Sequence, residues 1–342
     1  MICFKPALAG LLLFAGMTHA QGIESMSVSP DGQTVLISAA NRVVYTVGAD
    51  TLEVSSRRYI PEMVRQIIHS DDGALVYLRD EEEQLIAYNS ADMAQVWRIE
   101  GADEVVYDGV NGVLAVLDEH WKDDSIRLVA ADTGNQMTRV ALGKIKSDML
   151  ALGPDAKSAL ILTQSSKSDV ETSQEQPADL NKLQKAEFKQ KTDGYVSTVI
   201  TVDFDLGEFT TSESHYRVSY PHQVRMMGDK MMVLRSNIDS ALVGADGSAK
   251  LIDLGEDYFN AAMVDNAGKT FVLTNGVDLR FVPVDGGSAE GLLTAQRLPG
   301  GPAEWVTATA EGKDGTLYFG TNASRLFKVS ADRGSVQAVA VY

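Results

Sequence analysis

Residues 29 to 37 read SPDGQTVLI, and this short stretch decides the fold. Pro30, Asp31 and Gly32 form a strong turn signal: proline presets φ, the aspartate carboxylate caps the turn, and glycine accepts a positive φ. The β-branched and apolar residues that follow are typical of a buried strand. The stretch therefore predicts a tight turn that leads directly into a strand.

The same combination of turn and strand recurs about every forty residues. The further turns begin at Asp71, Val110, Pro154, Met227, Asn266 and Lys313. Most units then show a second strand, as at residues 43–45, and several close with another Asp or Gly turn before a weaker, more polar strand. Each unit is therefore predicted to hold four short antiparallel strands.

About seven such units in one chain predict an all-β fold, a β-propeller of seven four-stranded blades. A β-sandwich is the alternative, but it does not require one order of turns at one period throughout. An α-solenoid is excluded because helical 3.6-residue periodicity is missing from almost the whole chain.

Two segments resemble a known group of proteins. Ser29-Pro30-Asp31-Gly32 before a strand and Ala131-Asp132-Thr133-Gly134 closing one are similar to YVTN-type and WD-repeat-like bacterial propellers. The resemblance covers nearly all of the chain after residue 20, but the Gly-His and Trp-Asp dipeptides of true WD repeats are missing. It therefore implies the fold, within a group whose members bind, scaffold or catalyse.

The N-terminus predicts export. Lys5 precedes an apolar run over residues 7–17, and small residues follow at Thr18 and Ala20. This pattern is typical of a secretory signal peptide cleaved after about Ala20, and the run is too short to span a bilayer. We therefore expect residues 1–20 to be removed and residues 21–342 to form a single propeller domain, periplasmic or secreted, without a membrane anchor.

Composition excludes several chemistries. The single cysteine, Cys3, lies within the predicted signal peptide, so the mature chain would have no disulfide, thiolate metal site, iron–sulfur cluster or attached haem. The net charge of -17 argues against a nucleic-acid partner. No nucleophile elbow, Walker loop or dinucleotide fingerprint is present, so no cofactor is expected.

One polar insertion breaks the repeat, at about residues 164–194 in the connection between the second and third strands of blade four. Residues 178–191 could form a short helix ahead of Gly194, or the segment could remain disordered until a partner binds. We predict that this long polar loop contacts a partner.

The candidate site is a ring of residues that enter the innermost strands at the channel mouth. Its predicted members are Glu24, Glu62, Glu104, Asp148 and Glu304, with His222 and Asn260 in the other two blades. Clustered carboxylates in a concave mouth would favour a cation, either a hard metal ion or a Lys/Arg-rich segment of a protein. Simple capping of turns by these carboxylates is the alternative.

Two classes of function remain open. The first is a binding or scaffolding module that binds a basic envelope protein through the acidic face and the long polar loop. The acidic tracts at residues 80–83 and 118–124 are expected on that face. The second is an enzyme, since similar propellers include lactone hydrolases and subunits of quinone-dependent dehydrogenases; Glu62, Glu104, Asp148 and His222 would then carry the chemistry. The first class is favoured because the sequence offers a charged face and a loop but no catalytic motif.

Overall fold

The computed structural model describes residues 22–118, 123–144, 147–167, 175–217, 221–235, 240–254, 259–285, 290–297 and 303–342. The predicted signal peptide and its cleavage site lie outside the described residues. Within them, no helix has the length and apolar character needed to cross a bilayer.

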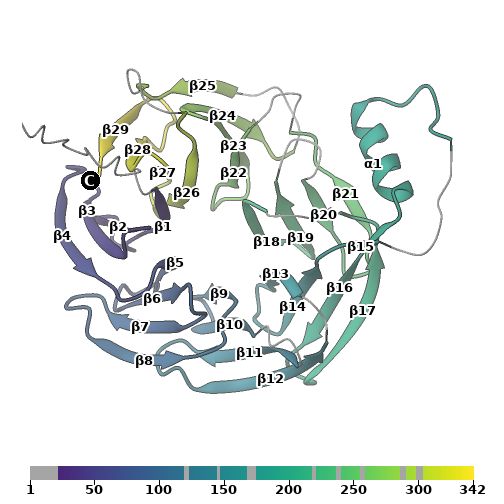
Figure 1. The fold of residues 1–342 in the computed structure, drawn as a ribbon, viewed down its shortest axis with the longest axis horizontal. Helices are drawn as coiled ribbons and strands as arrows, with labels where there is room; N and C mark the ends of the chain where they lie inside the picture. The colour runs from purple at the N-terminus through teal and green to yellow at the C-terminus, as the bar shows by residue number, and fades with distance from the viewer. Residues whose placement is uncertain are drawn as a thin grey trace, which may run out of the picture.

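Seven antiparallel sheets form a ring, which confirms the predicted seven-bladed β-propeller (Figure 1). Each blade is built from strands that are consecutive in the sequence, from the channel outward, with one extra two-stranded pairing in blade 4. Blade 1 holds β1 (Ile23–Val28), β2 (Thr34–Ala39), β3 (Val43–Gly48) and β4 (Val54–Tyr59). Blade 2 holds β5 (Val64–His69), β6 (Leu75–Asp80), β7 (Leu85–Asn89) and β8 (Gln95–Ile99). Blade 3 holds β9 (Glu104–Asp108), β10 (Val113–Asp118), β11 (Asp124–Ala130) and β12 (Gln136–Gly143).

The remaining blades follow the same plan. Blade 4 holds β13 (Ser147–Leu152), β14 (Ser158–Thr163), β16 (Tyr195–Asp203) and β17 (Glu208–Ser214), and β15 (Ser166–Lys167) pairs with the start of β16. Blade 5 holds β18 (Gln223–Met227), β19 (Lys230–Leu234), β20 (Ala241–Val243) and β21 (Ala249–Leu251). Blade 6 holds β22 (Ala261–Val264), β23 (Thr270–Asn275), β24 (Asp278–Pro283) and β25 (Glu290–Thr294). Blade 7 holds β26 (Val306–Glu311), β27 (Leu317–Thr321), β28 (Arg325–Val329) and β29 (Val336–Ala340).

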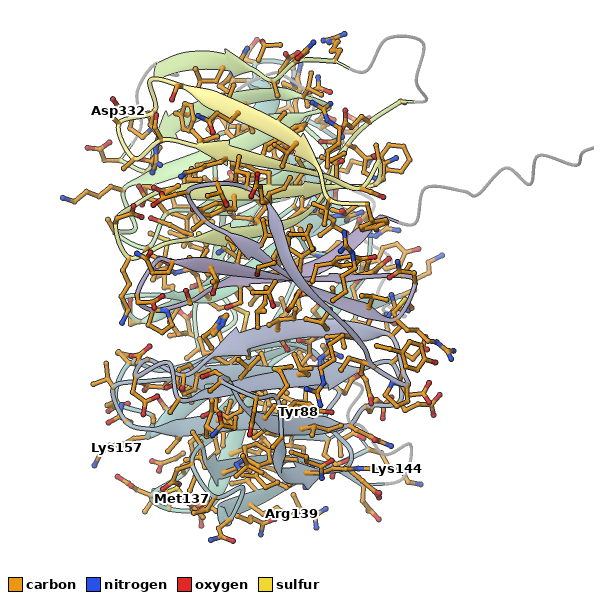
Figure 2. The ribbon with its side chains drawn as sticks, turned by 90° about the vertical axis from the view of Figure 1, so that its left-hand side faces the viewer. Tyr88, Met137, Arg139, Lys144, Lys157 and Asp332 are labelled. Carbon is orange, nitrogen blue, oxygen red and sulfur yellow. The ribbon has the colours of Figure 1, made fainter. Side chains whose placement is uncertain are left out.

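The repeated turns owe their shape to one hydrogen bond. Asp31 Oδ1 accepts from the backbone N–H of Gln33, two residues on, at 3.0 Å, while Gly32 adopts a φ of 71°. The same bond is made by Asp72, Asp155, Asp246, Asp314 and Asp332. These turns gather on one face, here called the turn face; Figure 2 shows Lys157 and Asp332 on it and Lys144, between blades 3 and 4, at the opposite face. That opposite face, where the innermost strands begin, is called the mouth face.

The hydrophobic core lies between adjacent blades. One cluster joins Leu117 and Ile126 of blade 3 to Ile161 and Ile200 of blade 4, all fully buried. Second strands are apolar on both faces because both faces meet a neighbouring blade; β14, for example, is buried from Ala159 to Thr163. Blade-to-blade packing therefore supplies the stability that a chain without a described disulfide needs.

Within residues 22–342 as far as they are described, the ring closes without a strand shared between the two ends, since the sheets of blades 1 and 7 each contain only their own four strands. Instead, side chains join the two blades. Thr307 Oγ1 donates to the carbonyl oxygen of Ile23, and Lys328 Nζ donates to that of Ala49 at 2.8 Å. The rings of Tyr45 and Tyr342 stack with centroids 4.9 Å apart.

The insertion between β14 and β16 contains α1 (Lys182–Thr192), so the helical alternative is the one found. The helix lies outside the ring, beside β15, β16 and β21 (Figure 1). Asn181 caps it, accepting from Gln184 N at 2.9 Å while Gln184 Oε1 accepts from Asn181 N at 3.0 Å.

Candidate functional site

A β-bulge marks the start of the innermost strands. In blades 1, 2, 4 and 7 the pairing register skips one residue, as at Glu24 between the pairs Ile23–Ala39 and Ser25–Ser38. In blades 3, 5 and 6 the residue before the first pair donates its N–H to the same partner strand residue, as His222 does to the Leu234 carbonyl at 2.7 Å. The skipped residue in the first group of blades, and the residue before the first pair in the second group, are called the entry position. The residue that follows it is called the first-pair position.

The bulge fixes which residues are equivalent in the seven blades. The entry positions are Glu24, Arg65, Asp103, Asp148, His222, Asn260 and Thr307. The first-pair positions are Ser25, Gln66, Glu104, Met149, Gln223, Ala261 and Ala308.

The predicted ring members thus occupy three different depths in the structure. Glu24, Asp148, His222 and Asn260 hold entry positions, and Glu104 holds a first-pair position. Glu62 and Glu304 precede the entry positions of their blades by three residues. The side chain of Asp148 lies outside the described part of the structure.

Basic side chains accompany several of the predicted acids. Arg65 Nη1 lies 3.2 Å from Glu24 Oε2, so entry positions of opposite charge meet between blades 1 and 2. Arg42 lies 4.0 Å from Glu62 and 3.6 Å from Glu81. These pairs are partly exposed and reduce the negative charge on this side of the mouth.

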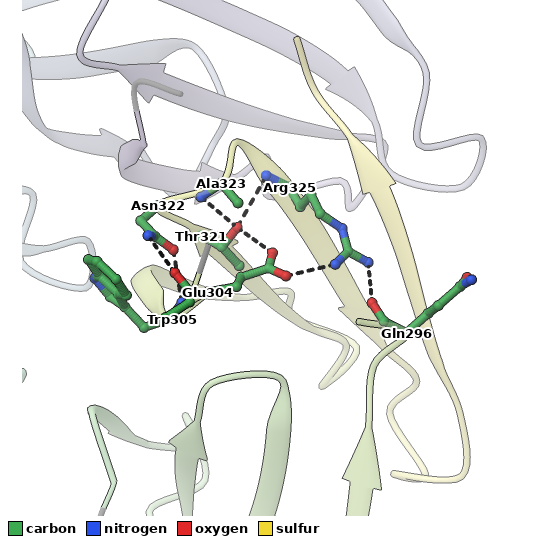
Figure 3. A network of polar contacts seen from close by, with 8 residues as sticks. Gln296, Glu304, Trp305, Thr321, Asn322, Ala323 and Arg325 are labelled. Atoms are coloured by element: carbon green, nitrogen blue, oxygen red, sulfur yellow. Dashed lines mark hydrogen bonds and ion pairs between the residues drawn. The ribbon is translucent and has the colours of Figure 1, made fainter. Parts of the chain in front are cut away.

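Glu304 belongs to a buried network in blade 7 (Figure 3). Its Oε2 lies 2.8 Å from Arg325 Nη1, and its Oε1 accepts from Thr321 Oγ1 at 2.8 Å. Beside it, Asn322 accepts from Trp305 N at 2.8 Å and so holds the backbone of an exposed tryptophan. Asn260 also has a structural contact, because it accepts from Thr274 Oγ1 at 3.1 Å.

Glu104 and His222 are brought together in one hollow of about 640 Å³ along the innermost strands of blades 2 to 5. The first-pair positions of these four consecutive blades, Gln66, Glu104, Met149 and Gln223, all line it. Glu104 and His222 are among the predicted ring members, whereas Gln66 and Gln223 are not. Aligning the first-pair positions exactly would have found both glutamines.

The two glutamines are held in place by bonds between blades. Gln66 Nε2 donates to the Val105 carbonyl at 3.0 Å, while its Oε1 accepts from Arg79 Nε at 3.3 Å. Gln223 Oε1 accepts from Val264 N at 2.7 Å. The wall of the hollow is therefore organised before any ligand enters.

The titratable groups of the hollow differ in character. Burial, with a smaller effect of Arg235, lowers the pKa of His222 below its ordinary value, so the imidazole is neutral at neutral pH. Tyr107 accepts from Asp71 N at 3.0 Å, and burial raises the pKa of its hydroxyl. The glutamate carboxylate, a neutral imidazole and two amides would accept hydrogen bonds from a cationic or polar group.

The acidic tracts are partly structural. Asp80 is buried, and its Oδ1 accepts from the backbone N–H groups of Glu82 and Gln84 at 3.0 and 2.9 Å, which is turn capping. Asp118 lies 3.6 Å from Arg127. Residues 119–122 of the second tract lie outside the described residues. Among the side chains that are described, no three His, Cys, Asp or Glu groups lie close enough to share a metal ion.

The chain matches no protein-family model and no curated protein sequence. Among solved structures, one similar chain comes from "Kuenenia stuttgartiensis Hydrazine Synthase": it is 12% identical, with a TM-score of 0.61, over 94% of this chain and 96% of that chain. At this identity the likeness shows a β-propeller fold alone. Because 1641 chains of solved structures match, the fold does not distinguish one function from another.

Proposed function

We propose that this chain is an exported binding module, of the YVTN or WD-repeat-like kind of propeller, that holds a Lys/Arg-rich segment of an envelope protein at its channel mouth. The apolar run before residue 21 supports export. The insertion supplies a second region for contact with a partner.

The observation that carries the proposal is the hollow of about 640 Å³ that brings Glu104 and His222 together with Gln66 and Gln223. Its size suits a ligand group or the end of a long side chain. A lysine or arginine head entering it would meet one carboxylate and several neutral acceptors, in a chain whose net charge is -17.

Calorimetric titration with an oligolysine peptide tests the proposal. We expect binding that weakens as salt is raised and that falls about tenfold or more in the Glu104→Gln variant. Glu100→Gln is the matched control, because the Glu100 side chain is 81% exposed, pairs with Arg98 and does not line the hollow. Equal binding by wild type and Glu104→Gln would contradict the proposal.

A catalytic role is the second candidate, and the approach of a carboxylate and a neutral imidazole to one hollow is the observation that favours it. Such a pair could exchange protons with a substrate, as in a lactonase-like or quinone-dependent dehydrogenase-subunit propeller. A panel of lactones and of quinone-coupled alcohol oxidations would test it. Turnover that disappears in both Glu104→Gln and His222→Gln would favour the enzyme.

A further inference from the structure

A second hollow lies at the rim of the propeller, between α1 and the outer strand of blade 5. Its volume is about 240 Å³, and it is lined mainly by apolar surface. Gln190 and Lys191 of α1 form one wall, Ala249 and Leu251 of β21 form the other, and Tyr216 lies between them. The hollow is smaller than a typical drug-sized ligand site and has room for about one large side chain.

The helix wall is firmly seated. Leu183 and Ala186 of α1 pack against a buried cluster that contains Tyr216 and Leu251. Asp193 and Tyr195 come just after the helix, and both contact Arg217, which follows β17. The Arg217 guanidinium lies 4.1 Å from the centre of the Tyr195 ring and 3.8 Å from Asp193. The space between α1 and β21 is therefore bounded on both sides by packed elements.

The opposite wall, β21, is an edge strand. It pairs with β20 and stands last in the order of its sheet. Ile252 N donates to the Ser240 carbonyl at 2.8 Å. Because hydrogen bonds alternate along an antiparallel pair, the backbone N–H and C=O of Lys250 also face β20. The backbone groups of Ala249, which is partly exposed, consequently point outward, toward the side where a further strand would add, whereas Leu251 is only 4% exposed and is already covered.

The charge beside this groove is opposite to that of the molecule. α1 carries four lysines and one glutamate, Glu187, which also lines the hollow, while the whole chain has a net charge of -17. Lys182, Lys185, Lys189 and Lys191 are exposed, as is Lys250 on β21. A negatively charged segment would be attracted here and repelled by most of the remaining surface.

From these observations we infer that the groove between α1 and β21 binds an extended, acidic peptide segment, which adds to blade 5 as a fifth strand. Main-chain bonds to Ala249 would supply affinity, and one apolar side chain of the peptide would enter the hollow. Successive residues of a strand point to opposite sides, so acidic side chains two positions before and after that residue share its side and reach toward the lysines of α1. This site is separate from the central channel and independent of the function proposed for it.

Selection from a display library of random ten-residue peptides, on the predicted mature protein of residues 21–342, tests the inference. The selected peptides are expected to be net acidic, to lack proline at their centre and to carry an apolar residue there. Their affinities are then measured by fluorescence anisotropy on purified variants. Selected peptides without acidic bias would overturn the inference.

Two variants locate the binding. Ala249→Pro removes an outward N–H from an edge strand, where proline is tolerated, and should weaken binding about tenfold or more. Its control is Ala245→Pro, at the turn position where Pro30 and Pro154 stand in two other turns. Lys191→Glu should weaken binding about tenfold, and Lys182→Glu, at the far end of α1 and away from the hollow, less than about threefold.

Glu104→Gln separates this site from the channel: the peptides should bind it as they bind the wild type. Peptides that bind Ala249→Pro and Lys191→Glu as tightly as the wild type would overturn the inference. If Ala249→Pro does not fold, the Lys191→Glu and Lys182→Glu pair decides alone, since both lysines are exposed.

Discussion

Arg325 and Glu304 form a buried ion pair in blade 7, with side chains only 7% and 6% exposed and 2.8 Å between Nη1 and Oε2. The other groups of the pair are satisfied as well. Arg325 Nη2 donates to the Gln296 carbonyl at 2.7 Å, and Thr321 donates to Glu304. The pair therefore ties the connection that leaves blade 6 to the inner part of blade 7 (Figure 3).

Removing one member of this pair should be far more damaging than removing both. Glu304→Leu leaves the arginine charge buried without its partner, and we expect the free energy of unfolding to fall by about 3–5 kcal/mol. The double variant Glu304→Leu with Arg325→Met should lose much less. Urea unfolding of the single and double variants measures this. Glu100→Leu breaks an exposed pair and should lower the free energy of unfolding by at most about 1 kcal/mol. Equal losses for Glu304→Leu and Glu100→Leu would contradict the explanation.

Gly247 should be far less replaceable than Gly228. Both have positive φ, 80° and 64°, but a Cβ at Gly247 would overlap the carbonyl oxygen of Glu213, whereas Gly228 has nothing within 4 Å. Gly228→Ala is expected to cost about 1 kcal/mol from its backbone alone, and Gly247→Ala about 3 kcal/mol, since blades 4 and 5 must also separate. Thermal unfolding of the two variants provides the comparison.

His69 should make the stability of the propeller depend on pH. Burial lowers its pKa from 6.5 to about 4, an effect that Asp31 partly opposes, and its Nδ1 lies 2.9 Å from Ser27 Oγ across blades 1 and 2. The unfolded chain therefore binds the proton more readily, so stability is complete above about pH 6.5 and is lost as pH falls toward 4.

The slope of this loss should not exceed about 1.4 kcal/mol per pH unit. Urea unfolding between pH 4 and 7 measures it, and His69→Gln is the control because it keeps a polar contact for Ser27 but does not titrate. The pH dependence of the difference between the two proteins should largely vanish near pH 7, where His69 is mostly neutral in both the folded and the unfolded chain. A constant difference across the range would contradict this assignment.

The fold could be predicted from the sequence because its cause is local. Asp31 and Gly32 shape a turn through bonds to their own neighbours, and the repetition of that turn reveals the blades. The site was less predictable, because a β-bulge leaves no mark in composition. The position of the bulge depends on how the first and second strands of a blade pair. The prediction therefore took His222, one residue before Gln223, and Glu62, four residues before Gln66.

Glu304 illustrates a second limit. An acid ahead of a strand looks the same in sequence whether it faces solvent or meets a buried arginine 21 residues later. Ion pairing of this kind depends on tertiary packing, so the predicted acidic ring could not be separated from a set of structural carboxylates. The helix in the insertion was foreseeable from its composition, but its place beside β21 was not.

The last two residues should contribute strongly to closing the ring. Val341 is buried and donates its N–H to the Ser324 carbonyl at 2.9 Å, and Tyr342 stacks on Tyr45 of blade 1. Deleting both residues should lower the free energy of unfolding by about 3 kcal/mol, from lost apolar burial and stacking. Differential scanning calorimetry measures the loss. The Tyr342→Phe variant keeps the aromatic ring that stacks on Tyr45 and should retain most of the stability.

In the described part of the chain, no strand is shared between the first and last blades, so the order of the blades could be changed. Gly22 lies against Asn322, and Val341 bonds to Ser324, so both ends of the described chain reach the same hairpin of blade 7. A short linker could join them, and the chain could be opened between any two blades without dividing a sheet. Six circular permutants, beginning with blades 2 to 7, should then fold to the same ring as the original order.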